Sequence, residues 1–120
     1  MTGLSIERMG HLGIVGCRGR MVSSEAALEL RRAVMSLRDV PYIVLDLSEV
    51  ITLEGGSLGM LVFLGRWAHA QHIEMRVFNP RKAVRERLDL MRSIQPLNPV
   101  SLGELMSLLA EENMDTAVAA

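Results

Sequence analysis

The chain has 120 residues, of which 49% are hydrophobic and 22% are charged, so it is long enough for one domain with a hydrophobic core and too short for two. The formal net charge of -1 provides no field that would attract nucleic acid or an anionic membrane. The single cysteine, Cys17, cannot form a disulfide within the chain, and no apolar run approaches the roughly 20 residues that span a bilayer. We therefore expect a soluble cytoplasmic protein that neither binds nucleic acid nor inserts into a membrane.

The first third of the chain predicts a β-hairpin followed by an amphipathic helix. Residues 4–9 and 11–18 have the pattern of two short strands that pair with each other. Ser23 or Ser24 is typical of a helix N-cap, and apolar residues then recur at helical spacing until Pro41 stops the helix.

Strands and helices alternate through the rest of the chain. Residues 42–47 are nearly all apolar, as expected of a central strand that is covered on both faces, and a helix should follow over residues 57–71. Residues 72–78 alternate as a strand does, and the Asn-Pro pair at 79–80 begins a basic third helix. A last amphipathic helix starts at Ser101.

This order of elements is typical of the α/β class, because short connections between strands and helices favour parallel pairing. We expect a single domain over residues 1–110, with a mixed, mostly parallel sheet of four to five strands and about four helices. Residues 111–120 are predicted to form a flexible C-terminal tail.

The junction between the predicted central strand and the second helix is the most informative part of the sequence. Residues 46–59 read DLSEVITLEGGSLG. Such a junction presents free backbone N–H groups and the positive end of a helix dipole, which suit an anion, a phosphorylated hydroxyl or a partner's loop. We therefore place the candidate functional site there.

This junction resembles, without a gap, the signature of STAS domains, the bacterial anti-sigma-factor antagonists, which is usually written D-L-S-x-V-x-x-I-D-S-S-G-L-G. The resemblance extends over roughly residues 4–109 and includes the turn at 19–21, the Asn-Pro pair at 79–80 and the Leu-Asp-Leu run at 88–90. It implies a STAS-like domain and a switch protein. In that family the unphosphorylated form binds an anti-sigma factor with kinase activity, and phosphorylation of the second loop serine breaks the complex.

Two functional positions of the family are altered in this chain. Where the family has an aspartate, a serine, the phosphoacceptor serine and a glycine, this sequence has, in the same order, Glu54, Gly55, Gly56 and Ser57. Val22 falls where the family has an aspartate linked to the kinase partner. Because glycine has no hydroxyl, the resemblance implies a module without the usual phosphorylation switch.

Ser57 and Glu54 each have two interpretations. Ser57 is a candidate phosphoacceptor in place of Gly56, but we interpret it as an ordinary N-cap, whose hydroxyl oxygen accepts a helix N–H and contributes about 1 kcal/mol. Glu54 is most simply a carboxylate that compensates the helix dipole, and a fixed mimic of a phosphorylated state is the alternative. An enzyme with Glu54 or Asp46 as general base would need a second catalytic group that the sequence does not indicate, so we expect no catalytic residues.

The predicted second helix has two apolar sides, and only one can face the sheet. Helical spacing puts one set of residues on the core side, namely Leu58, Leu61, Val62, Gly65 and Ala68, and a second set on the other, namely Met60, Phe63, Leu64 and Trp67. We expect the second set to be an exposed stripe that binds a partner, because Met and aromatic side chains are enriched at interfaces. Burial of part of the stripe under a neighbouring helix or the C-terminal tail is the alternative.

The remaining candidate groups are interpreted as structural. The basic residues of the third helix alternate with acidic ones and lack aromatic neighbours, so we expect a solvated face whose best functional match is an acidic patch on a protein. His11, His69 and His72 lack the spacing of metal ligands, and Cys17 is interpreted as a buried small hydrophobe. We expect neither a metal nor a cofactor.

The sequence thus predicts a non-enzymatic regulatory module that docks an anti-sigma factor or serine-kinase-like protein. The predicted partner-binding residues are Glu54, Gly55, Gly56, Ser57, Met60, Phe63, Leu64 and Trp67. The alternative is a STAS scaffold subunit of a larger complex, such as a lipid-transport ATPase or a stressosome-like assembly, in which the apolar stripe is permanently buried. The sequence leaves a homodimer open.

Overall fold

The structure is a computed structural model that describes residues 3–119, with side chains described as far as Glu112. In chain order the elements are β1 (Gly3–Met9), β2 (Leu12–Met21), α1 (Ser24–Met35), β3 (Tyr42–Leu53), α2 (Gly55–Ala70), β4 (Glu74–Phe78), α3 (Lys82–Leu90), β5 (Pro99–Val100) and α4 (Leu102–Ala119).

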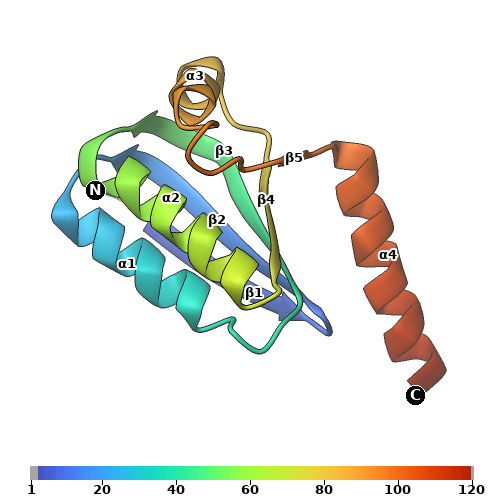
Figure 1. The fold of residues 1–120 in the computed structure, drawn as a ribbon. Coiled ribbons are helices and arrows are strands. Elements are labelled where there is room, and N and C mark those ends of the chain that lie inside the picture. Colours follow the sequence, from blue (N-terminus) through green and yellow to red (C-terminus); the bar gives the residue numbers. More distant parts are fainter. Residues whose placement is uncertain (1–2, 120) are drawn as a thin grey trace.

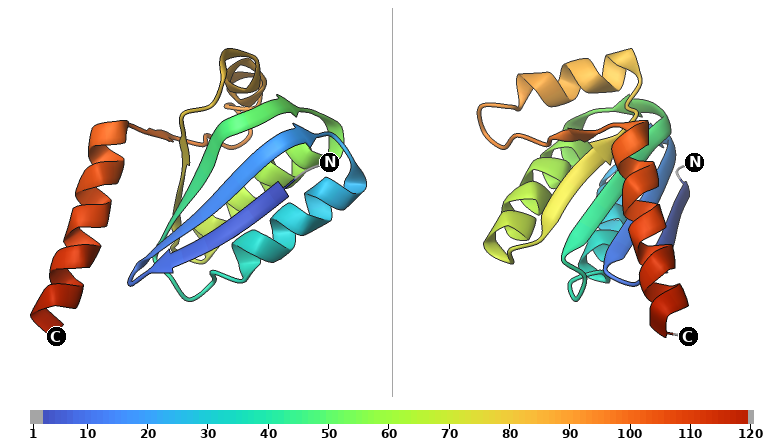
Figure 2. Two further views of the ribbon diagram at one scale, coloured as in Figure 1. Left: turned by 180° about the vertical axis from the view of Figure 1, so that it is seen from behind. Right: turned by 90° about the vertical axis from the view of Figure 1, so that its right-hand side faces the viewer.

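The strands form one five-stranded sheet in the order β1-β2-β3-β4-β5. β1 and β2 make an antiparallel hairpin, whereas the pairs β2–β3, β3–β4 and β4–β5 are parallel. Figure 1 shows α1 and α2 side by side over one face of the sheet and α3 across its end. The right-hand view of Figure 2 shows α4 on the opposite face. The predicted α/β fold, with a mixed, mostly parallel sheet, is confirmed for the part of the chain that the structure describes.

Local chemistry explains where the first elements begin and end. The hairpin turns at Gly10, whose φ of 59° lies in the left-handed region that favours glycine. α1 begins after Ser23, whose hydroxyl oxygen accepts a hydrogen bond from the Ala26 N–H at 3.1 Å. Ser23 is therefore the cap, and Ser24 is the first residue of the helix.

Each face of the sheet contributes to its own layer of the core. Between the sheet and the helices α1 and α2, the largest fully buried side chains include Leu30, Leu45, Leu47, Leu61 and Leu64. On the other face Leu12, Val44 and Val100 are buried, and leucines of α4 pack against them. β3 supplies both layers, so the prediction that residues 42–47 are covered on both faces is confirmed.

β3 and α2 both extend further than the sequence predicts. β3 continues to Leu53, because Val50 and Leu53 are as deeply buried as the earlier part of the strand. α2 starts at Gly55 rather than at residue 57. The loop between strand and helix is consequently reduced to Glu54.

α4 crosses the second face of the sheet and is held by two polar contacts. The Arg76 guanidinium on β4 lies 2.9 Å from the Glu104 carboxylate, and the Glu112 carboxylate accepts the His11 backbone N–H at 3.1 Å. The helix continues to residue 119, where the sequence predicts a tail from residue 111, and the flexibility of that segment remains a prediction. Within residues 3–119, no helix is both long and apolar enough to span a membrane.

The predicted exposed stripe on α2 is partly wrong. Leu64 is fully buried, and Met60 and Trp67 are half-buried against the same core cluster. Only Phe63, at 47% exposure, is an exposed member. The reason is that α2 packs against α1 as well as the sheet, so its buried arc is wider than one side of the helix.

Cys17 is confirmed as a buried residue of β2, with 3% of its surface exposed. Burial, with a smaller contribution from the Asp46 carboxylate, raises the pKa of its thiol to about 12. The folded protein therefore keeps this thiol protonated at pH values where the unfolded chain ionises it.

This difference predicts a loss of stability in alkali. Above pH 9 the unfolded chain binds fewer protons at Cys17 than the folded chain, so the free energy of unfolding should fall as pH rises towards 12. The slope from this one group is at most about 1.4 kcal/mol per pH unit. Urea unfolding of the wild type and of Cys17→Ala between pH 8.5 and 11 checks it, because the variant lacks the titrating group. Parallel pH profiles for the two proteins would contradict the assignment.

Candidate functional site

The N-terminus of α2 is exposed and bare of side chains. Gly55 has a φ of 59°, so this turn into the helix favours glycine. A Cβ placed on Gly56 or on Gly59 would meet no atom within 4 Å. The glycine pair is therefore open to solvent at the mouth of the helix, and a partner could approach the backbone closely there.

The loop that precedes α1 lies against this glycine pair. The Glu54 N–H donates to the Met21 carbonyl at 3.2 Å, and a Cβ on Gly55 would lie 3.9 Å from the Val22 carbonyl oxygen. Val22 itself is 48% exposed. The two altered positions identified in the sequence, Val22 and Gly56, thus belong to one surface.

Ser57 is not the N-cap of α2, and its side chain is buried. It lies in the first turn of α2, behind the N-cap residue Glu54, and its exposure is 0%. Its hydroxyl points back to the Ser23 carbonyl oxygen, at 3.5 Å, instead of accepting a helix N–H. The prediction of an ordinary N-cap is wrong, because the helix begins two residues earlier, and a buried hydroxyl is a poor phosphoacceptor or partner contact.

Glu54 occupies the N-cap position, but its side chain makes no capping hydrogen bond. The carboxylate instead accepts from the Arg87 guanidinium of α3 at 2.6 Å, with both side chains 48% exposed. A second contact joins α3 to β3, because Arg81 donates to the Ser48 carbonyl at 3.1 Å. α3 is thus tied to the strand that enters the candidate site and to the loop itself.

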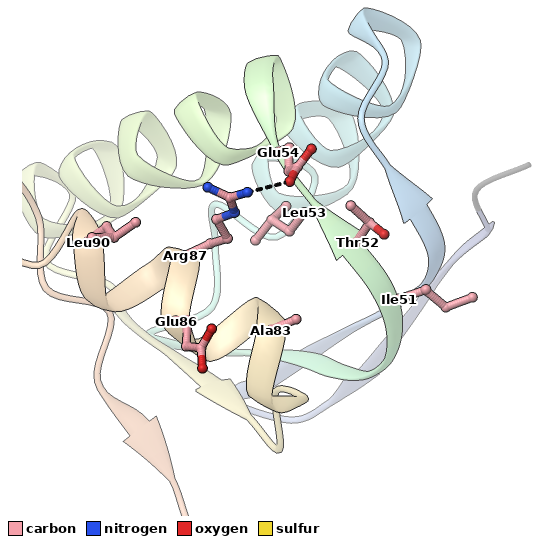
Figure 3. A pocket seen from close by; sticks show the side chains of 8 residues that line it. All are labelled: Ile51, Thr52, Leu53, Glu54, Ala83, Glu86, Arg87 and Leu90. Carbon is pink, nitrogen blue, oxygen red and sulfur yellow. Dashed lines mark hydrogen bonds and ion pairs between the residues drawn. The ribbon is translucent and has the colours of Figure 1, made fainter.

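A groove of about 320 Å³ lies beneath the Glu54–Arg87 ion pair. Figure 3 shows Arg87 reaching from α3 towards Glu54, with the end of β3 forming one wall and α3 the other. Two large apolar side chains at its edges are exposed, Ile51 at 51% and Leu90 at 71%. The groove opens beside the glycine pair and extends the candidate surface towards α3.

On the other side of the glycine pair, α1 and α2 present an apolar and basic surface. The Phe63 ring is exposed, and the Arg31 guanidinium lies 5.9 Å from its centroid. Leu28 of α1 is 47% exposed. These neighbours of α2 can contact a partner that combines apolar and acidic side chains.

Sequence reasoning identified the loop but missed its neighbours. The roles of Arg31 and Arg87 depend on which helices pack beside α2, and neither residue has a local motif. The sequence does show that the third helix is basic, which could have indicated a role for Arg87, but we interpret these basic residues there as a solvated face. Of the residues predicted to bind a partner, four are exposed in the structure, namely Glu54, Gly55, Gly56 and Phe63.

The chain has the STAS fold, the fold of anti-sigma factor antagonists. It superimposes on an anti-sigma factor antagonist from Mycobacterium paratuberculosis with a TM-score of 0.71 and 20% identity, over 92% of this chain and 95% of the other. A candidate anti-sigma factor antagonist from Thermotoga maritima matches with a TM-score of 0.73 and 17% identity, over 89% and 94%.

The anti-sigma factor antagonist SpoIIAA, in its unphosphorylated form, matches with a TM-score of 0.70 and 15% identity, over 98% of each chain. No model of a known protein family matches the sequence, and no curated protein does. The resemblance stated from the sequence is confirmed at the level of fold.

The Glu54–Arg87 contact predicts a measurable energetic coupling between the loop and α3. In a double-mutant cycle of Glu54→Gln and Arg87→Gln, the coupling should be about 0.2–1 kcal/mol at low ionic strength, as for other exposed ion pairs. It should diminish in 1 M salt, where charges are screened over about 3 Å. Unfolding free energies measure it, and the cycle with Lys82→Gln, a neighbouring charge outside the ion pair, should give none. A zero coupling at low salt would contradict the predicted energetic link between the loop and α3.

Proposed function

We propose that this protein is a non-enzymatic regulatory module that docks a protein partner of the anti-sigma factor type. The surface is formed by the Glu54–Gly56 loop, the exposed residues of α2 that follow it, and Val22 beside them. The observation that carries the proposal is the bare N-terminus of α2, where no atom stands within 4 Å of a Cβ on Gly56. The STAS fold supports the class of partner.

The geometry of this surface suits a protein rather than a small substrate. Gly56 and Gly59 expose helix backbone, so a partner can pack closely against α2, and Phe63 provides an aromatic anchor four residues further on. Arg31 beside Phe63 provides a positive charge at the edge. We expect the partner to present an apolar patch with acidic side chains around it.

The module works by contact rather than by covalent switching. Gly56 offers no hydroxyl at the exposed position, and the nearest hydroxyl of α2, on Ser57, is buried. A phosphate at the mouth of α2 would add about -1.5 to -2 charges, which is enough to repel an acidic partner. With no acceptor there, occupancy of the surface depends on partner concentration and affinity.

Docking through α2 predicts that Phe63→Ala weakens partner binding at least about tenfold, because truncating a central aromatic anchor costs about 2 kcal/mol or more of binding free energy. Calorimetry with purified anti-sigma factors of the native host measures the affinity. Leu102→Ala is the matched control, since Leu102 is 62% exposed on α4 and should have no effect. Equal affinities for the wild type and Phe63→Ala would overturn the assignment of the surface. Stable co-purification with a membrane ATPase or a large shell would favour the scaffold alternative.

The missing acceptor predicts that incubation with an anti-sigma kinase and ATP leaves the wild type unmodified. Gly56→Ser should gain one phosphate, because the added side chain meets no neighbouring atom and its hydroxyl faces solvent. Intact-protein mass spectrometry measures the gain. Stoichiometric phosphate on the wild-type protein would contradict the proposal, and peptide mapping would identify the acceptor.

A further inference from the structure

A second cavity, of about 480 Å³, lies on the far side of α3 from the groove at Glu54. Its floor is apolar, since Val77 and Leu88 are almost completely buried and Leu97 packs, half-buried, against the same core cluster. Its rim is polar and includes the side chains of Asn79, Arg85, Asp89, Arg92 and Asn98. This size and this combination of an apolar floor with a few polar groups are typical of small-molecule sites.

The cavity lies where the chain leaves the parallel strands. β4 and β5 pair only through Val77–Pro99 and Phe78–Val100, and the Val77 N–H donates to the Asn98 carbonyl at 3.0 Å. Directly after β4, Asn79 has a φ of 50°, which turns the chain away from the sheet towards α3. Open α/β sheets characteristically bind ligands in crevices outside the carboxyl ends of their strands, and this cavity is in that position.

The charged groups at the rim favour a ligand with one negative charge. Arg85, Asp89 and Arg92 together carry a formal charge of +1, from two guanidinium groups and one carboxylate. Among the described residues, neither Arg85 nor Arg92 has a side-chain hydrogen bond or ion pair. Planar guanidinium groups bind carboxylates through two parallel hydrogen bonds, and the Asp89 carboxylate would repel a second negative charge.

We propose that this cavity binds a small monocarboxylate with an apolar chain or ring. The ligand carboxylate pairs with Arg85 and Arg92 at the rim, and its apolar part covers the floor formed by Val77, Leu88 and Leu97. The proposal does not depend on the protein-docking function, because none of these residues belongs to that surface.

α3 gives the ligand site a connection to the loop. One side of this helix lines the cavity with Arg85, Leu88 and Asp89, and its other side carries Arg87, which binds Glu54. A ligand in the cavity therefore contacts the same helix that is tied to the start of α2.

Isothermal titration calorimetry of the full chain with octanoate tests the site. We expect binding that weakens about tenfold in each of Arg85→Gln and Arg92→Gln, the loss typical of a charge-assisted hydrogen bond. Lys82→Gln, on the same helix but outside the cavity, is the matched control and should bind as the wild type does. Octanol has the apolar chain without the carboxylate, and inorganic phosphate has the negative charge without the chain. Each should therefore bind at least about tenfold more weakly than octanoate. Melting temperatures of the variants establish that they are folded.

Amide chemical shifts locate the bound octanoate independently. The expected changes are at Asn79, Asn98 and Val100. The proposal is overturned if octanoate does not bind, if the double variant Arg85→Gln/Arg92→Gln binds it with unchanged affinity, or if the shifts map to another part of the sheet. Equal affinity for octanol would equally exclude recognition of the carboxylate.

Discussion

The burial of β3 on both faces is the constraint on which the rest of the structure depends. Val44 is enclosed on the α4 side, and Ile43 and Leu45 are enclosed on the side of α1 and α2. Because neighbouring residues of a strand point to opposite faces, a slip by one residue would exchange these two sets between the two core layers and disrupt the packing of both. The register of β3 is therefore fixed, and so is the position of Glu54, which follows its last residue.

Much of the fold could be predicted from apolar periodicity, whereas the details of the site could not. The order of strands and helices follows from spacing, but spacing alone does not tell which of the two apolar sides of α2 is buried. The prediction of an exposed Leu64 is wrong because α1 covers part of α2 from the side. The prediction of Ser57 as the cap is wrong because the helix begins at a glycine pair, which is an unusual helix start. The Arg87–Glu54 contact joins residues that are distant in sequence, so it depends on tertiary structure alone.

α3 differs from the other helices in how it is held. It lies across the end of the sheet instead of on a face, and Val84 and Leu88 are its buried side chains. Polar contacts through Arg81 and Arg87 supplement this small apolar area. With few buried contacts of its own, α3 is expected to open locally more readily than α1 or α2. Because α3 lies between the two cavities and lines both, a movement of this helix would change the shape of each.

The register of the hairpin has a practical consequence for binding measurements. β1 begins at Gly3 opposite Arg18, close to the end of β2 that leads to Met21 and the loop beside Gly55. α4, in contrast, runs away from that edge across the far face of the sheet. A fusion tag or a biosensor linkage placed before β1 would crowd the glycine surface, while immobilisation through the last turn of α4 leaves that surface facing the solution.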